Sequence, residues 1–150
     1  AISHILQMIG NLLQSGFFHD KIAREDIVVV ILDMMSPDRN AQFLSAAYCI
    51  CQISHNENTA AVMVECNVIP RLLVLLQVLT TMTSYKGPNS ESVVAVNYIW
   101  ITLMNLSQRQ LFFQQLVTAE GFMDEVCEEL REGGRHQLEV SQLAVNMTYH

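Results

Sequence analysis

The sequence predicts an all-α fold of stacked helical repeats, and two observations on spacing support this. Four apolar runs end at an amide side chain flanked by apolar or small residues, and these four anchors are Asn11, Gln52, Asn105 and Asn146. They lie 41, 53 and 41 residues apart, and a unit of that length is typical of helical repeats. The segments AREDIVVVIL, NVIPRLLVLL and GFMDEVCEEL also align without gaps. Each repeat therefore has a middle helix before its anchored helix.

The chain is expected to form one domain, residues 1–150. Its predicted parts are the last helix of a preceding repeat and three repeats, which cover 1–14, 15–54, 55–107 and 108–150. The longer middle interval contains a connection over 81–90 that is rich in Thr, Ser, Gly and Pro. Insertions of this kind fall in loops on one face of a repeat protein.

The elements before the second anchor follow from apolar periodicity and from helix-stopping residues. An apolar helix is predicted from Ile2 to Gln14, followed by a short segment over 17–23. The next helix is predicted over 26–35, because Ser36-Pro37-Asp38 stops it. The anchored helix of this repeat is then predicted over 41–54.

The second repeat begins at a polar break over 55–58, which starts a short helix that continues to Cys66. Its middle helix begins around Pro70, since proline suits a first helical turn where no amide donor is needed. Its anchored helix is predicted over 92–107.

The third repeat has a short helix over 109–118 and a middle helix that Gly121 introduces. Gly133-Gly134 ends that middle helix, and the last anchored helix runs over 137–149.

Composition and charge exclude several classes of protein. Hydrophobic residues make up 51% of the chain and charged residues 15%, against about 25% charged in an average soluble domain. Helices packed between neighbours explain this bias. The net charge of −7 argues against nucleic acid as a partner, because phosphate binding needs clustered Lys and Arg.

Membrane and export signals are also not expected. The apolar run over 68–82 contains Pro70 and Arg71, and the run over 93–106 is shorter than the roughly 20 residues of a membrane span. Residues 1–13 have no basic start and no cleavage-like site, so no signal peptide is predicted. The chain does not begin with Met, which suggests that it was cut from a longer one.

The four cysteines, Cys49, Cys51, Cys66 and Cys127, show neither a disulfide framework nor metal-ligand spacing. They are interpreted as small buried hydrophobic residues in a reducing cytosol. The expected location is the cytoplasm, with the nucleus as an alternative.

The anchored helices share a polar stripe. Positions seven before, four before, at and three after each anchor lie on one helix face. These positions hold His4, Gln7, Asn11 and Gln14; Ser45, Tyr48, Gln52 and His55; Tyr98, Ile101, Asn105 and Gln108; and Glu139, Gln142, Asn146 and Tyr149. Only Ile101 is neither polar nor amphipathic. We call this set the amide stripe.

Almost every other position near the anchors is apolar or small, including Ile5, Met8 and Leu12 in the first helix. A helix that is apolar nearly all round is buried on most sides, so the amide stripe is the face expected to stay open. In a stack of such helices the stripes form one groove. Amide side chains both donate and accept, and could therefore pair with the backbone of an extended peptide.

Structural interpretations of the same residues stay open. The amides could instead bond between helices and only hold the stack together. Tyr48, Tyr98 and Tyr149 could be packing residues of the groove wall or ligand contacts.

The chain resembles the armadillo-repeat family over essentially its whole length. The family's middle helix starts Gly-ile-pro-x-leu-val-x-leu-leu, and residues 67–76, NVIPRLLVLL, follow this with Asn in place of Gly. The family's third helix ends in a pattern like ala-leu-x-asn-leu-ser, matched by LMNLS over 103–107. The resemblance implies a right-handed superhelix of three-helix repeats. It also implies peptide binding along a groove lined by the third helices, with an Asn ladder at Asn11, Asn105 and Asn146 and with Gln52 as a substitute.

Two departures argue against the best-known uses of such a groove. Nuclear-import adaptors of the family carry Trp four residues before each Asn, where this chain has Gln7, Tyr48, Ile101 and Gln142. Trp100 is one residue out of register and is expected in the core. Adhesion and signalling members line the groove with Lys and Arg, and the amide stripe has neither.

Catalysis, metals and cofactors find no support in the sequence. The five histidines lack a motif such as His-Glu-x-x-His, and no Gly-rich phosphate loop follows a strand. The predicted third middle helix is acidic, and its carboxylates are Asp124, Glu125, Glu128, Glu129 and Glu132, with Glu120 just before it. They are interpreted as a solvated face or as a second contact surface for a basic partner.

The resulting prediction is a non-catalytic scaffold that binds an extended or partly helical segment of a protein partner along the amide stripe. The alternatives are a structural spacer in a longer array, or an adaptor: a ubiquitin-ligase substrate receptor, a transport adaptor or a small-GTPase regulator. The chain is expected to be monomeric or part of a longer one.

Overall fold

The computed structural model describes residues 2–16, 21, 24–35, 40–81, 91–108, 121–132 and 137–148, and within these ranges every regular element is an α-helix. The described helices are α1 (Ile2–Gln14), α3 (Glu25–Asp33), α4 (Asn40–Ser54), α5 (Glu57–Glu65), α6 (Val68–Thr81), α7 (Glu91–Ser107), α9 (Phe122–Glu132) and α10 (Gln137–Thr148). The predicted all-α class is confirmed.

The helix limits agree closely with those expected from the sequence. α1 has the predicted limits, and α6 begins two residues before Pro70, which keeps that proline in the first turn. The predicted short helix over 109–118, the stop at 36–38 and Gly133-Gly134 lie outside the described residues. So do most of the 17–23 segment and most of the 81–90 connection.

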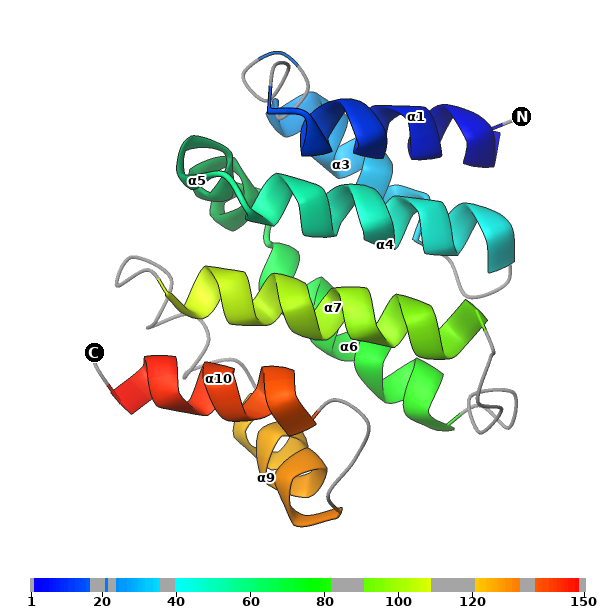
Figure 1. Cartoon of the computed structure of the whole chain (residues 1–150). Helices are drawn as coiled ribbons and strands as arrows, with labels where there is room; N and C mark the ends of the chain where they lie inside the picture. The colour runs from blue at the N-terminus through cyan, green and yellow to red at the C-terminus, as the bar shows by residue number, and fades with distance from the viewer. Residues whose placement is uncertain are drawn as a thin grey trace.

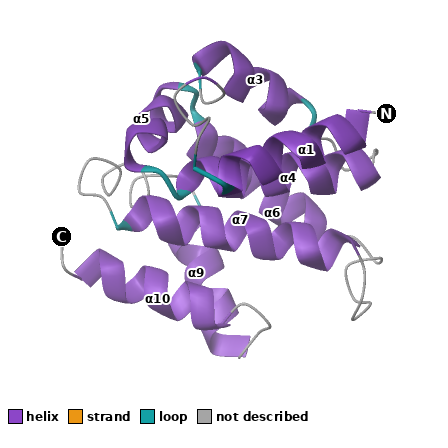
Figure 2. Ribbon diagram, turned by 45° about the horizontal axis from the view of Figure 1, so that its top comes forward, coloured by secondary structure: helices purple, strands orange, loops and turns teal. Residues whose placement is uncertain are grey.

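The helices form two layers. The anchored helices α1, α4, α7 and α10 lie side by side in chain order and run in the same direction (Figure 1). Behind them lie α3, α5, α6 and α9, and the turned view shows the same separation (Figure 2). α3 packs on α4, α6 on α7 and α9 on α10, so each middle helix contacts the anchored helix that follows it.

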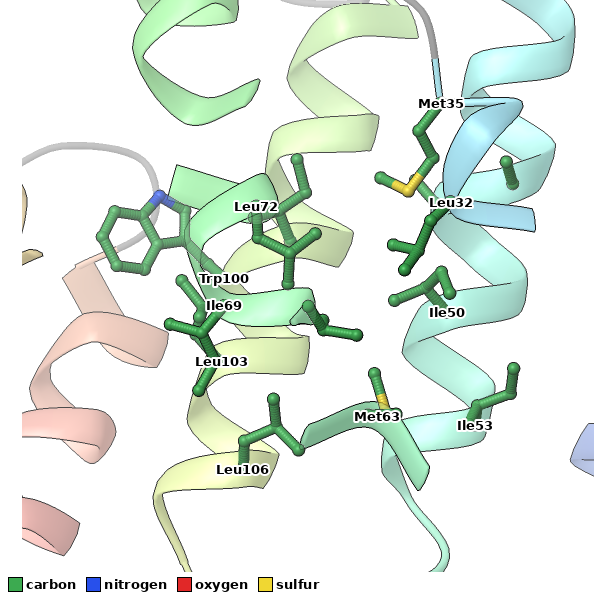
Figure 3. Close-up of a cluster of buried hydrophobic side chains, with 14 of the residues drawn as sticks. Leu32, Met35, Ile50, Ile53, Met63, Ile69, Leu72, Trp100, Leu103 and Leu106 are labelled. Atoms are coloured by element: carbon green, nitrogen blue, oxygen red, sulfur yellow. The ribbon is translucent and has the colours of Figure 1, made fainter. Parts of the chain in front are cut away.

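The core lies between the two layers. Figure 3 shows Ile69 and Leu72 of α6 facing Trp100 and Leu103 of α7, with Ile50 of α4 on the other side. All five side chains are buried. Trp100 is therefore a core residue, as predicted from its position one residue out of register.

Two turns before middle helices use the same backbone conformation. Asn67 precedes α6 with φ 58°, and Gly121 precedes α9 with φ 79°. These are aligned positions in the gapless alignment of the middle helices. A left-handed φ favours glycine, and asparagine is among the few other residues that tolerate it. This backbone conformation accounts for Asn at one of these aligned positions and Gly at the other.

The polar break before α5 is a helix cap. Asn56 Oδ1 accepts hydrogen bonds from the backbone N–H groups of Asn58 (2.9 Å) and Thr59 (3.3 Å). These are donors that the first turn of a helix cannot satisfy internally. The Thr59 hydroxyl donates to the Ile53 carbonyl at 2.6 Å, which ties the start of α5 to the end of α4.

Among the described helices, no single one is long and apolar enough to cross a membrane. One bent pair, Glu57–Met63 with Val68–Leu79, meets the length and composition limits only when both are counted together.

The Asn67 turn yields a stability prediction. Asn67→Ala should lower the free energy of unfolding by about 1 kcal/mol. The Cβ atom of alanine disfavours the left-handed backbone conformation, and alanine lacks the short polar side chain with which asparagine can form a local hydrogen bond. Asn67→Gly should keep or raise the free energy of unfolding. Urea unfolding followed by circular dichroism measures both. Glu65→Ala, an exposed change two residues earlier, is the control, and equal stability of the Ala and Gly variants would contradict the explanation.

Candidate functional site

Around its anchor, α4 is buried except for the residues of the amide stripe. From Ala46 to Ile53, only Tyr48 and Gln52 are partly exposed. On α7 the anchor Asn105 is only 8% exposed. The surface there is formed by half-buried Tyr98, Ile101 and Met104 and by exposed Gln108. On α1 and α10 the described stripe residues are half-buried or exposed: His4, Gln7, Asn11, Gln14, Glu139, Gln142 and Asn146.

A repeated hydrogen-bond pattern joins neighbouring anchored helices. Asn105 Nδ2 donates to Ser54 Oγ at 2.9 Å, and Asn146 Nδ2 donates to Ser107 Oγ at 3.2 Å. Each serine lies two residues after the previous anchor and donates its own proton to the carbonyl three residues before it. We call this pattern the Asn–Ser link. It fixes the register of α7 on α4 and of α10 on α7.

Between α1 and α4, a tyrosine takes the place of the Asn–Ser link. Position 13, two residues after Asn11, is a leucine, and the next anchor is Gln52. Tyr48 Oη donates to Asn11 Oδ1 (3.1 Å) and lies 3.2 Å from Gln14 Oε1. Its ring crosses α1 at Gly10, where an added Cβ would lie 2.5 Å from ring carbons. Gly10 is therefore needed for this close approach.

Tyr48 also connects α4 with α7. Its ring lies 5.5 Å from that of Tyr98 at a tilt of 52°, a favourable arrangement for an aromatic pair. Burial, and to a lesser degree the neighbouring tyrosine, raise the pKa of Tyr48, and burial raises the pKa of Tyr98. Both phenols are therefore neutral donors at physiological pH. The amide stripes of α1, α4 and α7 thus form one continuous surface.

Three glutamines of the amide stripe have no side-chain hydrogen bond with another described residue. They are Gln7 on α1, Gln52 on α4 and Gln108 after α7, while Gln142 Nε2 donates to Asn146 Oδ1 at 2.9 Å. The Asn105 amide nitrogen is occupied by Ser54 and also lies 3.3 Å from His55 Nδ1. These glutamines, more than Asn105 and Asn146, therefore carry the amide groups that a ligand can reach.

The remaining predicted stripe and acidic residues are placed as follows. His55 is exposed at the end of α4, and Tyr149 lies outside the described residues. On α9, Asp124 and Glu128 are exposed and Glu129 is half-buried, whereas the side chains of Glu125 and Glu132 are not described.

Two expectations are wrong. The apolar side chains of α1 were expected to be buried like those of the other anchored helices, but Ile5, Met8 and Leu12 are exposed. They are exposed because no described helix packs on that side of α1. Cys127 of α9 was also expected to be buried but is exposed, whereas Cys49, Cys51 and Cys66 are buried.

The buried thiols take part in helix packing. Cys49 Sγ lies 2.8 Å from the Leu6 carbonyl oxygen of α1, and Cys51 interacts with the Thr102 hydroxyl of α7. Burial raises the pKa of both thiols to about 12. Both stay protonated and unreactive at physiological pH.

The sequence interpretation missed Ser54, Ser107 and Gly10. A hydroxyl two residues after the anchor recurs at Ser54, Ser107 and Thr148, and this recurrence could have identified the serines. Gly10 carries no such signal, because only the path of the Tyr48 ring shows its role.

A pocket of about 320 Å³ lies between α3 and α6. Its lining is apolar apart from Arg71, which pairs with Asp33 at 2.9 Å. Within the described residues, no group of three or more His, Cys, Asp or Glu side chains could hold a metal ion.

Comparisons of the chain with models of protein families, with curated proteins and with solved structures found no match.

The contact between Tyr48 and Gly10 predicts that the effect of Gly10→Ala on the free energy of unfolding reverses when Tyr48 is removed. Gly10→Ala should lower the free energy of unfolding by about 1 kcal/mol, because the added methyl group displaces the tyrosine ring. In a Tyr48→Ala background the same change should raise it by roughly 0.5–1 kcal/mol, since alanine favours helix over glycine. Denaturant unfolding of the four proteins measures this cycle. Stabilisation by Gly10→Ala in both backgrounds would show that the ring does not lie over α1.

The cysteines yield a reactivity prediction. At pH 8 a thiol with a pKa of about 12 is ionised in roughly one molecule in 10⁴, and the thiolate is the reactive form. Iodoacetamide should therefore modify exposed Cys127 first and leave Cys49 and Cys51 intact in the folded chain, as peptide mass spectrometry would show. Urea-unfolded protein, in which all four should react, is the control. Modification of Cys49 as fast as Cys127 would contradict the packing of α4 on α1.

Proposed function

We propose that this protein is a non-catalytic scaffold that binds an extended segment of a partner protein along the amide stripe. The observation that carries the proposal is the surface of α4, where Tyr48 and Gln52 are the accessible residues of an otherwise buried stretch. A hydrogen bond from Tyr48 to Asn11 and the pair of Tyr48 with Tyr98 join this surface to the stripes of α1 and α7.

The dimensions of the surface suit an extended peptide. Packed helices lie about 8–10 Å apart, so the three steps from α1 to α10 span roughly 24–30 Å. An extended chain covers about 3.3 Å per residue. A segment of about seven to nine residues would therefore cross all four helices.

The chemistry of the surface indicates recognition of peptide backbone. Gln7, Gln52 and Gln108 each offer a donor and an acceptor, and a peptide unit offers the same pair in return. The tilted rings of Tyr48 and Tyr98 supply an apolar surface on the same stripe. No Lys or Arg lies on the amide stripe, so a strongly acidic ligand is disfavoured.

We further propose that the two layers are part of an armadillo-type, right-handed superhelix. Three features support this: the shared direction of the anchored helices, the packing of each middle helix on the next anchored helix, and the left-handed turn at Asn67 and Gly121. In such an arrangement the amide stripe lines the concave face.

A structural spacer is the second candidate, and the Asn–Ser links favour it. Asn105 and Asn146 use their donor groups to hold neighbouring helices, which is the role of a spacer. The two candidates differ in one outcome, because a spacer has no ligand on the amide stripe.

Selection from a library of random decapeptides tests the proposal. The chain should enrich peptides whose binding is weakened about tenfold or more in the triple variant Gln7→Ala, Gln52→Ala, Gln108→Ala. Three hydrogen bonds at 0.5–1.5 kcal/mol each account for this loss. Calorimetry with a selected peptide measures it.

The control is the double variant Asp124→Ala, Glu128→Ala on α9, which should bind the same peptide with unchanged affinity. Unchanged binding by the triple glutamine variant, or the failure of any peptide to enrich, would contradict the scaffold and support the spacer.

A further inference from the structure

The side of α7 that carries the amide stripe is apolar over most of its length. Four apolar or aromatic side chains follow one another there at spacings of three and four residues, which place them on one helix face. They are Val94, which is 41% exposed, and the half-buried Tyr98, Ile101 and Met104, with half-buried Asn97 among them. We call these four side chains the apolar strip. At 1.5 Å per residue it is about 15 Å long.

The packing of the stack does not account for this strip. α7 lies between α4 and α10 and has α6 behind it (Figure 1), so three of its sides are covered by described helices. The apolar strip lies on the fourth side, where a polar face is usual. At the position of Ile101 the other anchored helices have Gln7, Tyr48 and Gln142. A row of accessible apolar side chains on this one helix marks a site of contact.

One carboxylate lies beside the apolar strip. Glu139, the only carboxylate of the amide stripe, has the position on α10 that Tyr98 has on α7. Its side chain is half-buried and forms no ion pair with a described residue. The same position is half-buried at Ser45 and Tyr98, on helices with an anchored helix on both sides, so it stays accessible within the row. Packed helices lie about 8–10 Å apart, and the bond from Asn146 to Ser107 holds α10 in register with α7. Glu139 is therefore about one helix spacing from Tyr98.

We propose that the partner segment carries a large apolar side chain and, two or three residues from it, a Lys or Arg. This inference rests on the proposed binding of an extended segment along the amide stripe. The apolar side chain packs on the apolar strip of α7, and the cation pairs with Glu139. An extended chain advances about 3.3 Å per residue, so two or three residues span about 7–10 Å, which matches the step from α7 to α10. The net charge of −7 also favours a cationic segment over an anionic one.

Three kinds of group then recognise different parts of the segment. Gln7, Gln52 and Gln108 pair with peptide backbone, which every sequence offers. The apolar strip selects a large apolar side chain because burial of that side chain stabilises the complex. Glu139 selects a cation and disfavours a carboxylate at the same place. The amides therefore supply affinity for an extended chain, and α7 and Glu139 supply the sequence preference.

Sequencing of the decapeptides selected from the random library tests the preference. Compared with the unselected library, they should be enriched in Leu, Ile, Met, Phe or Trp placed two or three residues from a Lys or Arg. Peptides that enrich without this pair would overturn the inference and leave the scaffold proposal standing. The failure of any peptide to enrich would overturn both.

Calorimetry with one selected decapeptide tests the apolar strip. The double variant Ile101→Ala, Met104→Ala should bind it about tenfold more weakly, because the apolar side chain of the peptide loses its contact surface. Val74→Ala, at a side chain of α6 that is 59% exposed, removes apolar surface from the outer layer and should leave the affinity unchanged. Equal affinity of the double variant and the unchanged chain would overturn the inference.

A reversal of charge tests the carboxylate. Glu139→Lys should weaken binding of the same decapeptide roughly tenfold, since an attraction becomes a repulsion. It should also bind a second decapeptide, in which Glu replaces the basic residue, more tightly than the unchanged chain does. Glu128→Lys makes the same change at an exposed position of α9 and should alter neither affinity. The cation does not pair with Glu139 if Glu139→Lys and Glu128→Lys bind the two decapeptides alike, and that result would overturn the inference.

Discussion

The packing of parallel anchored helices in constant register is the constraint on which the rest of the structure depends. An anchored helix inside the row buries one side against the preceding anchored helix and the opposite side against the next one, while its middle helix covers a third side. Around the anchor of α4, from Ala46 to Ile53, only Tyr48 and Gln52 then stay accessible. The polar surface is therefore a consequence of the stack. A slip of one residue would rotate it by about 100° into the core.

The register is held by different contacts at different steps. The Asn–Ser links hold the steps to α7 and α10, and Tyr48 over Gly10 holds the step from α1 to α4. A buried amide with satisfied hydrogen bonds specifies one arrangement, since any other leaves a polar group without a partner. Asn105 and Asn146 therefore hold neighbouring helices together, and the proposed peptide binding depends on the glutamines beside them.

Much of this organisation could be predicted from the sequence. The helices followed from apolar runs and stop signals, because local periodicity decides them, and Trp100 was placed in the core by its register alone. It could not be predicted which amides form hydrogen bonds between helices and which stay accessible, since Asn105 and Gln52 occupy equivalent positions. What separates them is the residue on the neighbouring helix, a serine in one case and a leucine in the other. The exposure of the apolar side chains of α1 was missed for a related reason. Their spacing predicts that they contact another surface, but it does not show which surface that is.

Side-chain amide NMR of the ¹⁵N-labelled chain, titrated with a peptide selected for binding, tests the central claim most directly. If the stack leaves the glutamines open and engages the asparagines, the NH₂ signals of Gln7, Gln52 and Gln108 will shift with added peptide. The NH₂ signal of Asn105 will keep slow exchange with water in both states, because Ser54 holds it in a buried site. Rapid exchange at Asn105, or unchanged NH₂ signals of Gln7, Gln52 and Gln108 when the peptide is bound, would contradict the account.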